Sequence, residues 1–242
     1  MKWDNVFPGR DFRKDVEIVL GRISDVYGVE YPEGYVDVLV EKYKEKVPFP
    51  HVFIRTGEDR LKSINKDYQR ILEKVKNGGK ILDYGAGYGE SGRLLVNDGC
   101  SKENIVMFDV VPKTKEMGYD LFLDQYEWDD NFVVANPEDF SFENEFDVVY
   151  SGSVFHCISH EDDRKKYLQN AFNALKEGGE FIGTTLGGNK SKDEYLFLPD
   201  KADFENYLRD VGFGEIEVKE GENPSPHGTG FNCSRLWFSA WK

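Results

Sequence analysis

The segment ILDYGAGYG, residues 81–89, constrains the fold more than any other part of this sequence. An apolar strand, a glycine-rich turn and the start of a helix follow one another here. In open α/β sheets this first turn lies at the carboxyl ends of the strands, where ligands bind. The helix after the turn presents unpaired backbone N–H groups, which suit an anionic group such as a carboxylate. The segment therefore predicts a ligand site at one edge of a parallel sheet.

Helices and strands alternate from about residue 60 onward. Apolar runs predict strands over 80–85, 104–109, 131–136, 146–151 and 180–186, and helical spacing predicts helices over 60–76, 90–96, 113–125, 161–175 and 201–211. Ser159 and Asp162 fit a capping box before the fourth helix, and Gly178-Gly179 is expected to end it. Residues 215–220 and 233–241 predict an antiparallel hairpin. The fold class is α/β, with a mostly parallel seven-stranded sheet, an antiparallel C-terminal strand and helices on both faces.

Residues 1–59 differ from the rest of the chain, because they are helical in pattern and rich in aromatic residues and prolines. We expect them to form an N-terminal helical lid or substrate segment, and residues 60–242 to form the ligand-binding domain. The aromatic side chains of this segment either cover an apolar substrate or pack against the sheet edge. They are Tyr27, Tyr31, Tyr35, Tyr43, Phe49 and Phe53.

The chain has 31 basic and 45 acidic residues, a net charge of −14, and no basic stripe. Nucleic acid and an anionic membrane surface are therefore not expected as partners. The three cysteines form no CxxC pair, so neither a zinc site nor a redox motif is expected. The first ten residues lack the apolar core of a signal peptide, and no run of about 18 apolar residues predicts a transmembrane helix. We expect a cytoplasmic protein, and the sequence leaves its oligomeric state open.

Acidic residues accompany the glycine turn. Asp109 ends the second strand, where a carboxylate can accept hydrogen bonds from both hydroxyls of a ribose; dehydrogenases and methyltransferases share this requirement. Glu90 stands where the dinucleotide pattern GxGxxG has its third glycine. A carboxylate there would repel a pyrophosphate, and Asp83 inside the preceding strand suits an ammonium group better than a phosphate. A nicotinamide oxidoreductase is therefore disfavoured.

These residues resemble the class I S-adenosylmethionine-dependent methyltransferases, whose first motif has the form hhDhGxGxG, where h is apolar. The resemblance covers about residues 60–186 and extends to Asp109, to FDVVYSGSVFHCI and to NALKEGGEFIGTT. It implies a Rossmann-like methyltransferase fold with S-adenosylmethionine as cofactor. The stretches DGCSKENIVMFDVVPKTKEMGYDLF, SVFHCI and VPFPHVFI also look like fungal methyltransferases of polyketide and meroterpenoid biosynthesis. Those enzymes act on hydroxyl or carboxylate groups of small molecules.

The resemblance also implies which residues hold the cofactor. It places Asp83 near the amino acid portion, Gly85, Ala86 and Gly87 beneath it, Asp109 at the ribose, Val110 beside the adenine, and Ser151 facing the methyl-donor region. Asn136 stands where the family often has Asp, and its side-chain oxygen can still contact the adenine amino group. Arg55 is a further candidate, because a guanidinium fork matches the cofactor carboxylate. A surface salt bridge is the alternative role for Arg55.

Methyl transfer is an in-line displacement, in which the protein aligns the reactants and excludes water. A hydroxyl acceptor benefits from a general base, and a carboxylate needs none. His156, shortly after the fourth strand, is the first candidate base; the alternative is that it caps or packs the loop. His227, between the last two strands, can reach the acceptor from the far side. His156 and His160 have i, i+4 spacing without HExxH, so no metal site is expected.

Several functions remain open at this point. The first is O-methylation of a hydroxyl or carboxylate of a small-molecule acceptor. The alternatives are N- or C-methylation of a small molecule or protein side chain, and a non-catalytic module that binds S-adenosylmethionine. Intact Gly85, Gly87 and Asp109 favour cofactor binding but do not decide activity. The acceptor is not specified, because the segments expected to form its pocket, residues 1–59 and 186–195, vary freely in the family.

Overall fold

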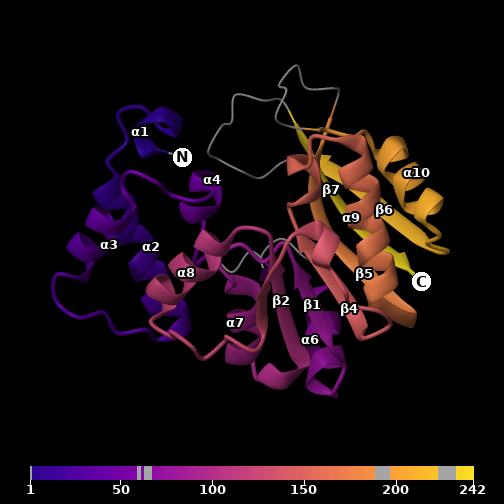
Figure 1. Cartoon of the computed structure of the whole chain (residues 1–242), viewed down its shortest axis with the longest axis horizontal. Coiled ribbons are helices and arrows are strands. Elements are labelled where there is room, and N and C mark those ends of the chain that lie inside the picture. The colour runs from indigo at the N-terminus through magenta and orange to yellow at the C-terminus, as the bar shows by residue number, and fades with distance from the viewer. Residues whose placement is uncertain (1, 59–60, 63–66, 189–196, 223–232) are drawn as a thin grey trace.

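The structure is a computed structural model, which describes residues 2–58, 61–62, 67–188, 197–222 and 233–242. Seven strands form one sheet in the order β3-β2-β1-β4-β5-β7-β6 (Figure 1). The strands are β1 Ile81–Tyr84, β2 Ile105–Asp109, β3 Phe132–Val134, β4 Phe146–Gly152, β5 Leu175–Gly187, β6 Ile216–Glu222 and β7 Ser234–Trp241. Strands β1 to β5 pair in parallel, and β7 is antiparallel to both β5 and β6. The predicted sheet and its C-terminal hairpin are confirmed.

Helices cover both faces of this sheet, because its strands are apolar on both sides. Leu82 and Tyr84 of β1 pack with α9 (Glu161–Ala174) and α10 (Lys201–Val211). Ile81, on the opposite face, packs with α6 (Tyr68–Lys76) and α7 (Glu90–Asn97). Helix α8 (Pro112–Phe122) follows β2. Short 3-10 helices span Lys102–Asn104 (η1), Pro137–Asp139 (η2) and Phe155–Cys157 (η3).

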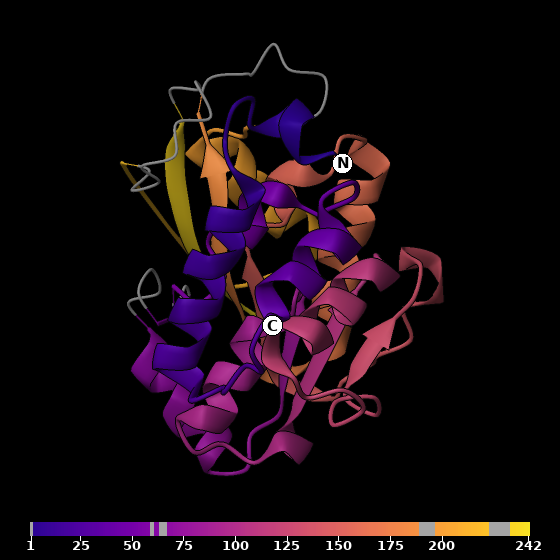
Figure 2. The ribbon, with the colours of Figure 1, turned by 90° about the vertical axis from the view of Figure 1, so that its left-hand side faces the viewer.

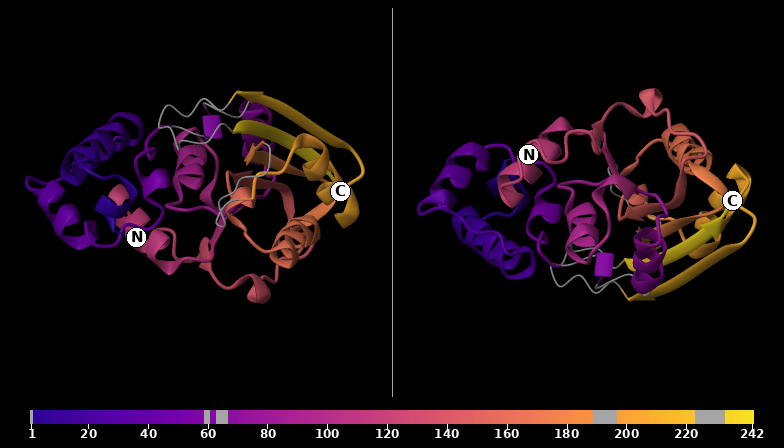
Figure 3. Two further views of the ribbon diagram at one scale, coloured as in Figure 1. Left: turned by 90° about the horizontal axis from the view of Figure 1, so that it is seen from above. Right: turned by 90° about the horizontal axis from the view of Figure 1, so that it is seen from below.

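The N-terminal part forms α1 (Trp3–Val6), α2 (Phe12–Tyr27), α3 (Tyr35–Tyr43) and α4 (Pro50–Phe53). These helices share a core with α8, which contributes Met117 and Leu121. Tyr31 and Tyr35 donate hydrogen bonds to the carbonyl oxygens of Leu121 and Asp120, at 2.5 and 2.8 Å. Figure 2 shows these helices in front of the sheet, and Figure 3 shows them at the end of the molecule opposite β6 and β7. Most of the N-terminal aromatics therefore pack in this shared core.

The boundary between α9 and β5 differs from the prediction. Helix α9 ends at Ala174, and Gly178-Gly179 lies inside β5. The β4–β5 register shifts between Phe146↔Leu175 and Val148↔Glu180, so the glycines form an irregularity in the strand. The predicted capping box is also wrong, because His160 is the N-cap of α9 and makes no side-chain cap hydrogen bond.

Helix α8 is shorter than the predicted 113–125, because Leu123 adopts a left-handed conformation with φ of 52°. Helix α6 begins at Tyr68, and residues 59–60 and 63–66 of the predicted helix lie outside the described residues. His227 and residues 189–195 of the expected pocket segment also lie outside them. In the described parts of the chain, no helix has the length and apolar character needed to cross a membrane.

Candidate functional site

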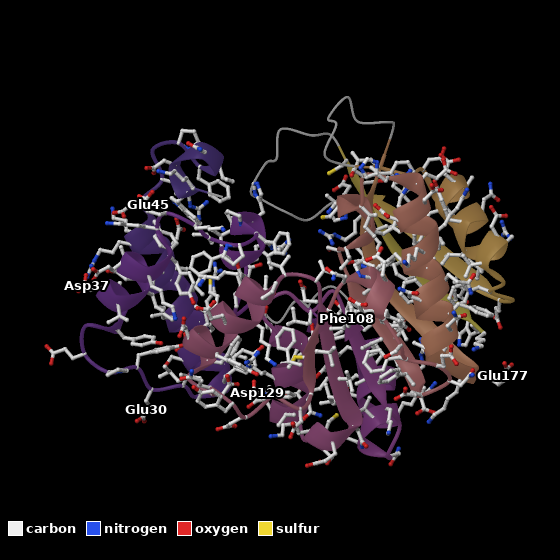
Figure 4. The ribbon with its side chains drawn as sticks, viewed as in Figure 1. Glu30, Asp37, Glu45, Phe108, Asp129 and Glu177 are labelled. Atoms are coloured by element: carbon white, nitrogen blue, oxygen red, sulfur yellow. The ribbon has the colours of Figure 1, made fainter. Side chains whose placement is uncertain are left out.

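The glycine turn joins β1 to α7 at the carboxyl edge of the sheet. Its first two N–H groups, from Gly85 and Ala86, both donate to the carbonyl oxygen of Phe108 at 2.9 Å. Figure 4 shows Phe108 near the centre of the molecule, between the N-terminal helices and the half that contains α9. Gly85, Gly87 and Gly89 have φ of 91°, 57° and 74°, a conformation that side chains disfavour. The backbone of the turn is thus fixed against β2.

The three glycines are needed for different reasons. A Cβ on Gly85 would lie 2.3 Å from Cγ2 of Val154, in the loop after β4. A Cβ on Gly89 would lie 2.9 Å from Sδ of Met107 in β2, as expected for close packing of the helix on the sheet. On Gly87 the nearest atom would be Cγ1 of Val52, at 3.8 Å. Gly87 therefore leaves open space beside the turn.

Asp109 binds the glycine turn directly. Its Oδ2 accepts the N–H of Gly87 at 2.8 Å, and its Oδ1 accepts the N–H of Val111 at 2.9 Å. Burial raises the pKa of the Asp109 carboxyl, and these backbone N–H groups oppose that shift. Each carboxylate oxygen has a second lone pair. The structure thus brings Asp109 and Gly87 together, as expected if the ligand binds between the end of β2 and the glycine turn.

Asp83 is buried in β1 with one unsatisfied oxygen, Oδ2. Burial raises its pKa to about 7, and the charges of Asp109 and Glu90 act in the same direction, while a hydrogen bond with Ser91 opposes them. A buried polar atom without a partner is costly. This oxygen is the strongest sign in the described residues that the turn receives a cation.

The other residues expected at the cofactor lie on the same edge in different environments. Val110 is 47% exposed directly after β2, an open apolar surface. Asn136 is exposed after β3, and its Nδ2 donates to Asp139 at 3.2 Å. Ser151 is buried within β4, and its hydroxyl forms a 2.6 Å hydrogen bond with Tyr167. The structure thus engages Ser151 with α9.

Arg55 lies in the N-terminal segment that contacts the turn. Its Nε donates to Glu58 at 2.9 Å, which is the salt-bridge alternative for this residue. Two residues on, the N–H of Gly57 donates to Glu90 at 2.8 Å. The hydroxyl of Tyr88, in the turn, donates to the carbonyl oxygen of Pro48. Residues 48–57 therefore bind the glycine turn at two points.

His156 lies in η3, buried beside the end of β5. Its Nδ1 accepts the backbone N–H of Leu186 at 3.3 Å and lies 3.1 Å from the hydroxyl oxygen of Thr185. The N–H of His156 also donates to that hydroxyl, at 3.2 Å. The loop after β4 is thus attached to β5 through this histidine. Across the described ranges, no group of three or more side chains is arranged to hold a metal ion.

Sequence reasoning missed a buried arginine at the same edge. Arg235 of β7 is 2% exposed, and its Nη1 donates to the hydroxyls of Ser153 and Thr184, at 3.1 and 3.4 Å. Ser153 has a φ of 69°, which is unusual for a residue other than glycine. An arginine within the apolar strand SRLWFSAW was the available signal for this cluster.

Comparison with known proteins identifies the family of this fold. Residues 81–179 match the family described as Methyltransferase domain. Methyltransferase adrK of Penicillium roqueforti is 31% identical over 104 residues, 40% of this chain and 37% of that protein. The Asnovolin E/Chermesin D methyltransferase nvfJ of Aspergillus novofumigatus is 28% identical over 146 residues, 58% and 52% of the two chains. The matched parts thus span from a little over a third to about half of these relatives.

A bacterial relative and a solved structure extend the comparison. Sarcosine/dimethylglycine N-methyltransferase of Halorhodospira halochloris is 30% identical over 164 residues, 60% of this chain and 55% of that protein. The structure of phosphoethanolamine N-methyltransferase 2 of Haemonchus contortus has a TM-score of 0.58 at 18% identity, covering 88% of this chain and 61% of that one. The strand order, the glycine turn and the match over residues 81–179 agree, and together they show the Rossmann-like fold of the class I S-adenosylmethionine-dependent methyltransferases.

Proposed function

We propose that this chain is an S-adenosylmethionine-dependent methyltransferase that methylates a carboxylate oxygen of a small molecule. The observation that carries the choice of acceptor is the hydrogen bond from the Leu186 N–H to Nδ1 of His156. The names of the fungal relatives, one of which includes Asnovolin E and Chermesin D, support a small-molecule acceptor.

The glycine turn suits a cationic cofactor. The buried, unsatisfied Oδ2 of Asp83 is stabilised by a nearby positive charge, which the ammonium group of S-adenosylmethionine supplies. The carboxylates of Asp109 and Glu90 add negative potential at Asp83. The open side of Gly87 gives the ligand access to the backbone. These features fit the cofactor that the family uses.

We assign the remaining cofactor contacts from the position of each residue. Asp109, which also accepts hydrogen bonds from the N–H groups of Gly87 and Val111, is assigned to the ribose hydroxyls, and the exposed Val110 is assigned to the adenine. Asn136 is assigned to the adenine amino group. Arg55 is bonded to Glu58 and Ser151 to Tyr167, so we assign these two residues a supporting role beside the cofactor site. When bound, the cofactor supplies an electrophilic methyl group, and the electrons of the broken bond stay on sulfur.

His156 is not placed to take a proton from the acceptor. A backbone N–H donates, so Nδ1 accepts, and the neutral ring carries its proton on Nε2. In this tautomer Nε2 is a donor. An alcohol acceptor gains about 10²–10⁴-fold in rate from a base, whereas a carboxylate is already ionised at neutral pH. The assigned tautomer therefore favours an acceptor that needs no base.

Positive and negative side chains lie at different places along this edge of the sheet, and the positive one favours a carboxylate acceptor. Arg235 places a guanidinium beside Ser153 and Thr184, at the ends of β4 and β5. The carboxylates Asp83 and Asp109 lie on β1 and β2. A guanidinium at these strand ends favours an anionic acceptor over a cationic one.

The N-terminal segment, residues 1–59, is assigned as the cover of the acceptor side. Two described contacts with the turn support this, the Gly57–Glu90 and Tyr88–Pro48 hydrogen bonds. The role of His227 in reaching the acceptor stays a prediction.

The cofactor assignment is tested by calorimetric titration with S-adenosylhomocysteine, S-adenosylmethionine and NAD. We expect micromolar binding of both sulfur nucleosides, no binding of NAD, and loss of binding in Asp109→Ala. Asp147→Asn is the matched control, because Asp147 pairs with Lys176 next to the start of β4, at the opposite edge of the sheet. Absence of nucleoside binding in the unmodified protein refutes the assignment.

The acceptor assignment is tested with radiolabelled S-adenosylmethionine and a panel of small carboxylic acids, phenols and amines. We expect label in a methyl ester, which alkaline hydrolysis releases as methanol. His156→Gln should retain activity on the acid within about tenfold, since no base is lost. A loss of 10²-fold or more on a phenol, with no activity on acids, contradicts the carboxylate assignment.

A second candidate is N-methylation of a small amine, which attacks the methyl group through its lone pair after its ammonium form has lost a proton to solvent. The match to sarcosine/dimethylglycine N-methyltransferase over 164 residues favours it. The same assay separates the two, because an N-methyl group survives alkaline hydrolysis and an ester does not.

A further inference from the structure

Arg93 is a buried arginine next to the glycine turn, and the proposed mechanism gives it no role. It lies in α7, four residues after Gly89, and is 5% exposed. Its Nη1 donates to the carbonyl oxygens of Tyr88 and Gly89, at 2.8 and 3.0 Å. Its Nε and Nη2 donate to Oδ2 and Oδ1 of Asp124, at 2.6 and 2.8 Å. One guanidinium thus joins the end of the turn to a carboxylate 31 residues further along the chain.

These bonds fix the orientation of two peptide groups. In a planar trans peptide the C=O and the N–H point in opposite directions. A carbonyl held toward Arg93 therefore turns the N–H of the next residue away from it. This applies to the N–H of Gly89, which donates to the carbonyl oxygen of Ala86 at 2.8 Å, and to the N–H of Glu90, the first residue of α7. Gly89 makes no side-chain cap hydrogen bond, so Arg93 holds this helix end together with the Tyr88–Pro48 and Gly57–Glu90 hydrogen bonds.

Asp124 holds the guanidinium in place from the loop after α8. The left-handed Leu123 precedes it. The guanidinium carbon also lies 4.4 Å from the centre of the Phe122 ring and 5.7 Å from that of Trp128. A bidentate pair in such an apolar environment has a defined geometry. The same position makes Gly89 obligatory, because a Cβ there would lie 2.5 Å from Nη1 of Arg93.

We infer that Arg93, held by Asp124, is a positioning residue for the cofactor, which sets the backbone of residues 88–90 to which the cofactor binds. This inference rests on the proposed function. Arg93 acts through Tyr88 and Gly89 and through the N–H groups that follow them. Its loss should weaken cofactor binding more than its effect on folding explains.

The test compares Arg93→Lys and Asp124→Asn with Arg70→Lys as matched control. Arg70 also forms a two-pronged pair with a buried carboxylate, Glu180, at the opposite edge of the sheet. Lysine reaches fewer of the four acceptor atoms than Arg93 does. Asp124→Asn keeps the guanidinium and its carbonyl bonds but weakens its anchor, so it remains informative if Arg93→Lys does not fold.

The readouts are the dissociation constant for S-adenosylhomocysteine, the urea midpoint, and hydrogen exchange of the peptide covering residues 85–93 in the ligand-free protein. We expect Arg93→Lys and Asp124→Asn to raise the dissociation constant about tenfold or more and to speed exchange in this peptide. Arg70→Lys should lower the urea midpoint while leaving the dissociation constant and the exchange rate of this peptide unchanged. Unchanged affinity in the two site variants, with a lower midpoint alone, overturns the inference. Absence of binding in the unmodified protein refutes the proposed function itself, and the inference with it.

Discussion

Replacing Asp83 by asparagine is expected to change how the stability of the ligand-free protein depends on pH. In the folded protein burial raises the pKa of this carboxyl to about 7, from an ordinary value of 3.8. The folded state therefore holds the proton more tightly than the unfolded state does. The stability that this proton gives is complete below the unfolded pKa and is lost as pH rises through about 7.

The two pKa values set the size of the effect. Linkage gives a loss of roughly 2.5 kcal/mol in unfolding free energy between pH 5 and pH 8 from Asp83 alone. Asparagine does not titrate, so Asp83→Asn should lack this loss. The difference between the two proteins is the quantity of interest, and it includes the interaction of Asp83 with the charge of Asp109.

Urea unfolding of both proteins at pH 5, 6, 7 and 8 measures this difference. Asp147→Asn is the control, because Lys176 and the Lys80 N–H hold the pKa of Asp147 below its ordinary value, outside this pH range. We expect the unfolding free energies of the two proteins to depend differently on pH between pH 5 and pH 8, and to depend on pH in the same way only above about pH 8. Parallel curves from pH 5 to pH 8 refute the argument that Asp83 is held protonated by burial.

Three further predictions follow from contacts at the same edge. Affinity for S-adenosylhomocysteine should rise with pH between 6 and 8, because its ammonium favours ionised Asp83, and calorimetry at each pH should show no such rise in Asp83→Asn. Gly85→Ala should lower the melting temperature and abolish binding, since its Cβ would lie 2.3 Å from Val154; an unchanged melting temperature contradicts this. Tyr167→Phe leaves the buried hydroxyl of Ser151 without its 2.6 Å partner. It should cost about 1–3 kcal/mol in urea unfolding, and a change below about 0.5 kcal/mol would show that the hydroxyl finds another partner.

The parts of the fold that local patterns encode were predictable. The apolar strand before Gly85 and the glycine turn are contiguous in sequence, and the alternation of strands with helices indicates a parallel sheet. The end of α9 was not predictable in this way. Gly178 is a typical helix stop, but the pairing of Leu175 with Phe146 had already begun the strand. Such pairing depends on a partner far away in the sequence.

The candidate site also contains residues that the sequence predicts and residues whose roles depend on distant partners. Gly87 and Asp109 are recognisable from spacing alone, and the structure joins them by a hydrogen bond. The tautomer of His156 depends on the N–H of Leu186, 30 residues away. The partner of Arg93, Asp124, lies 31 residues away, just after the end of α8, where helical spacing predicted that the helix continues. A sequence shows the chemistry of such residues but not which groups surround them.

The bond from the Tyr88 hydroxyl to the Pro48 carbonyl bears on attempts to change the acceptor by grafting. Exchange of the first 58 residues between related enzymes is the obvious route to a new specificity. In this chain those residues share a core with α8 and are anchored on the glycine turn itself. A graft that does not match Tyr88 and the buried face of α8 will disturb the cofactor site before it alters the acceptor. Productive chimaeras must therefore carry Tyr88 and the facing positions of α8 together with the transplanted helices.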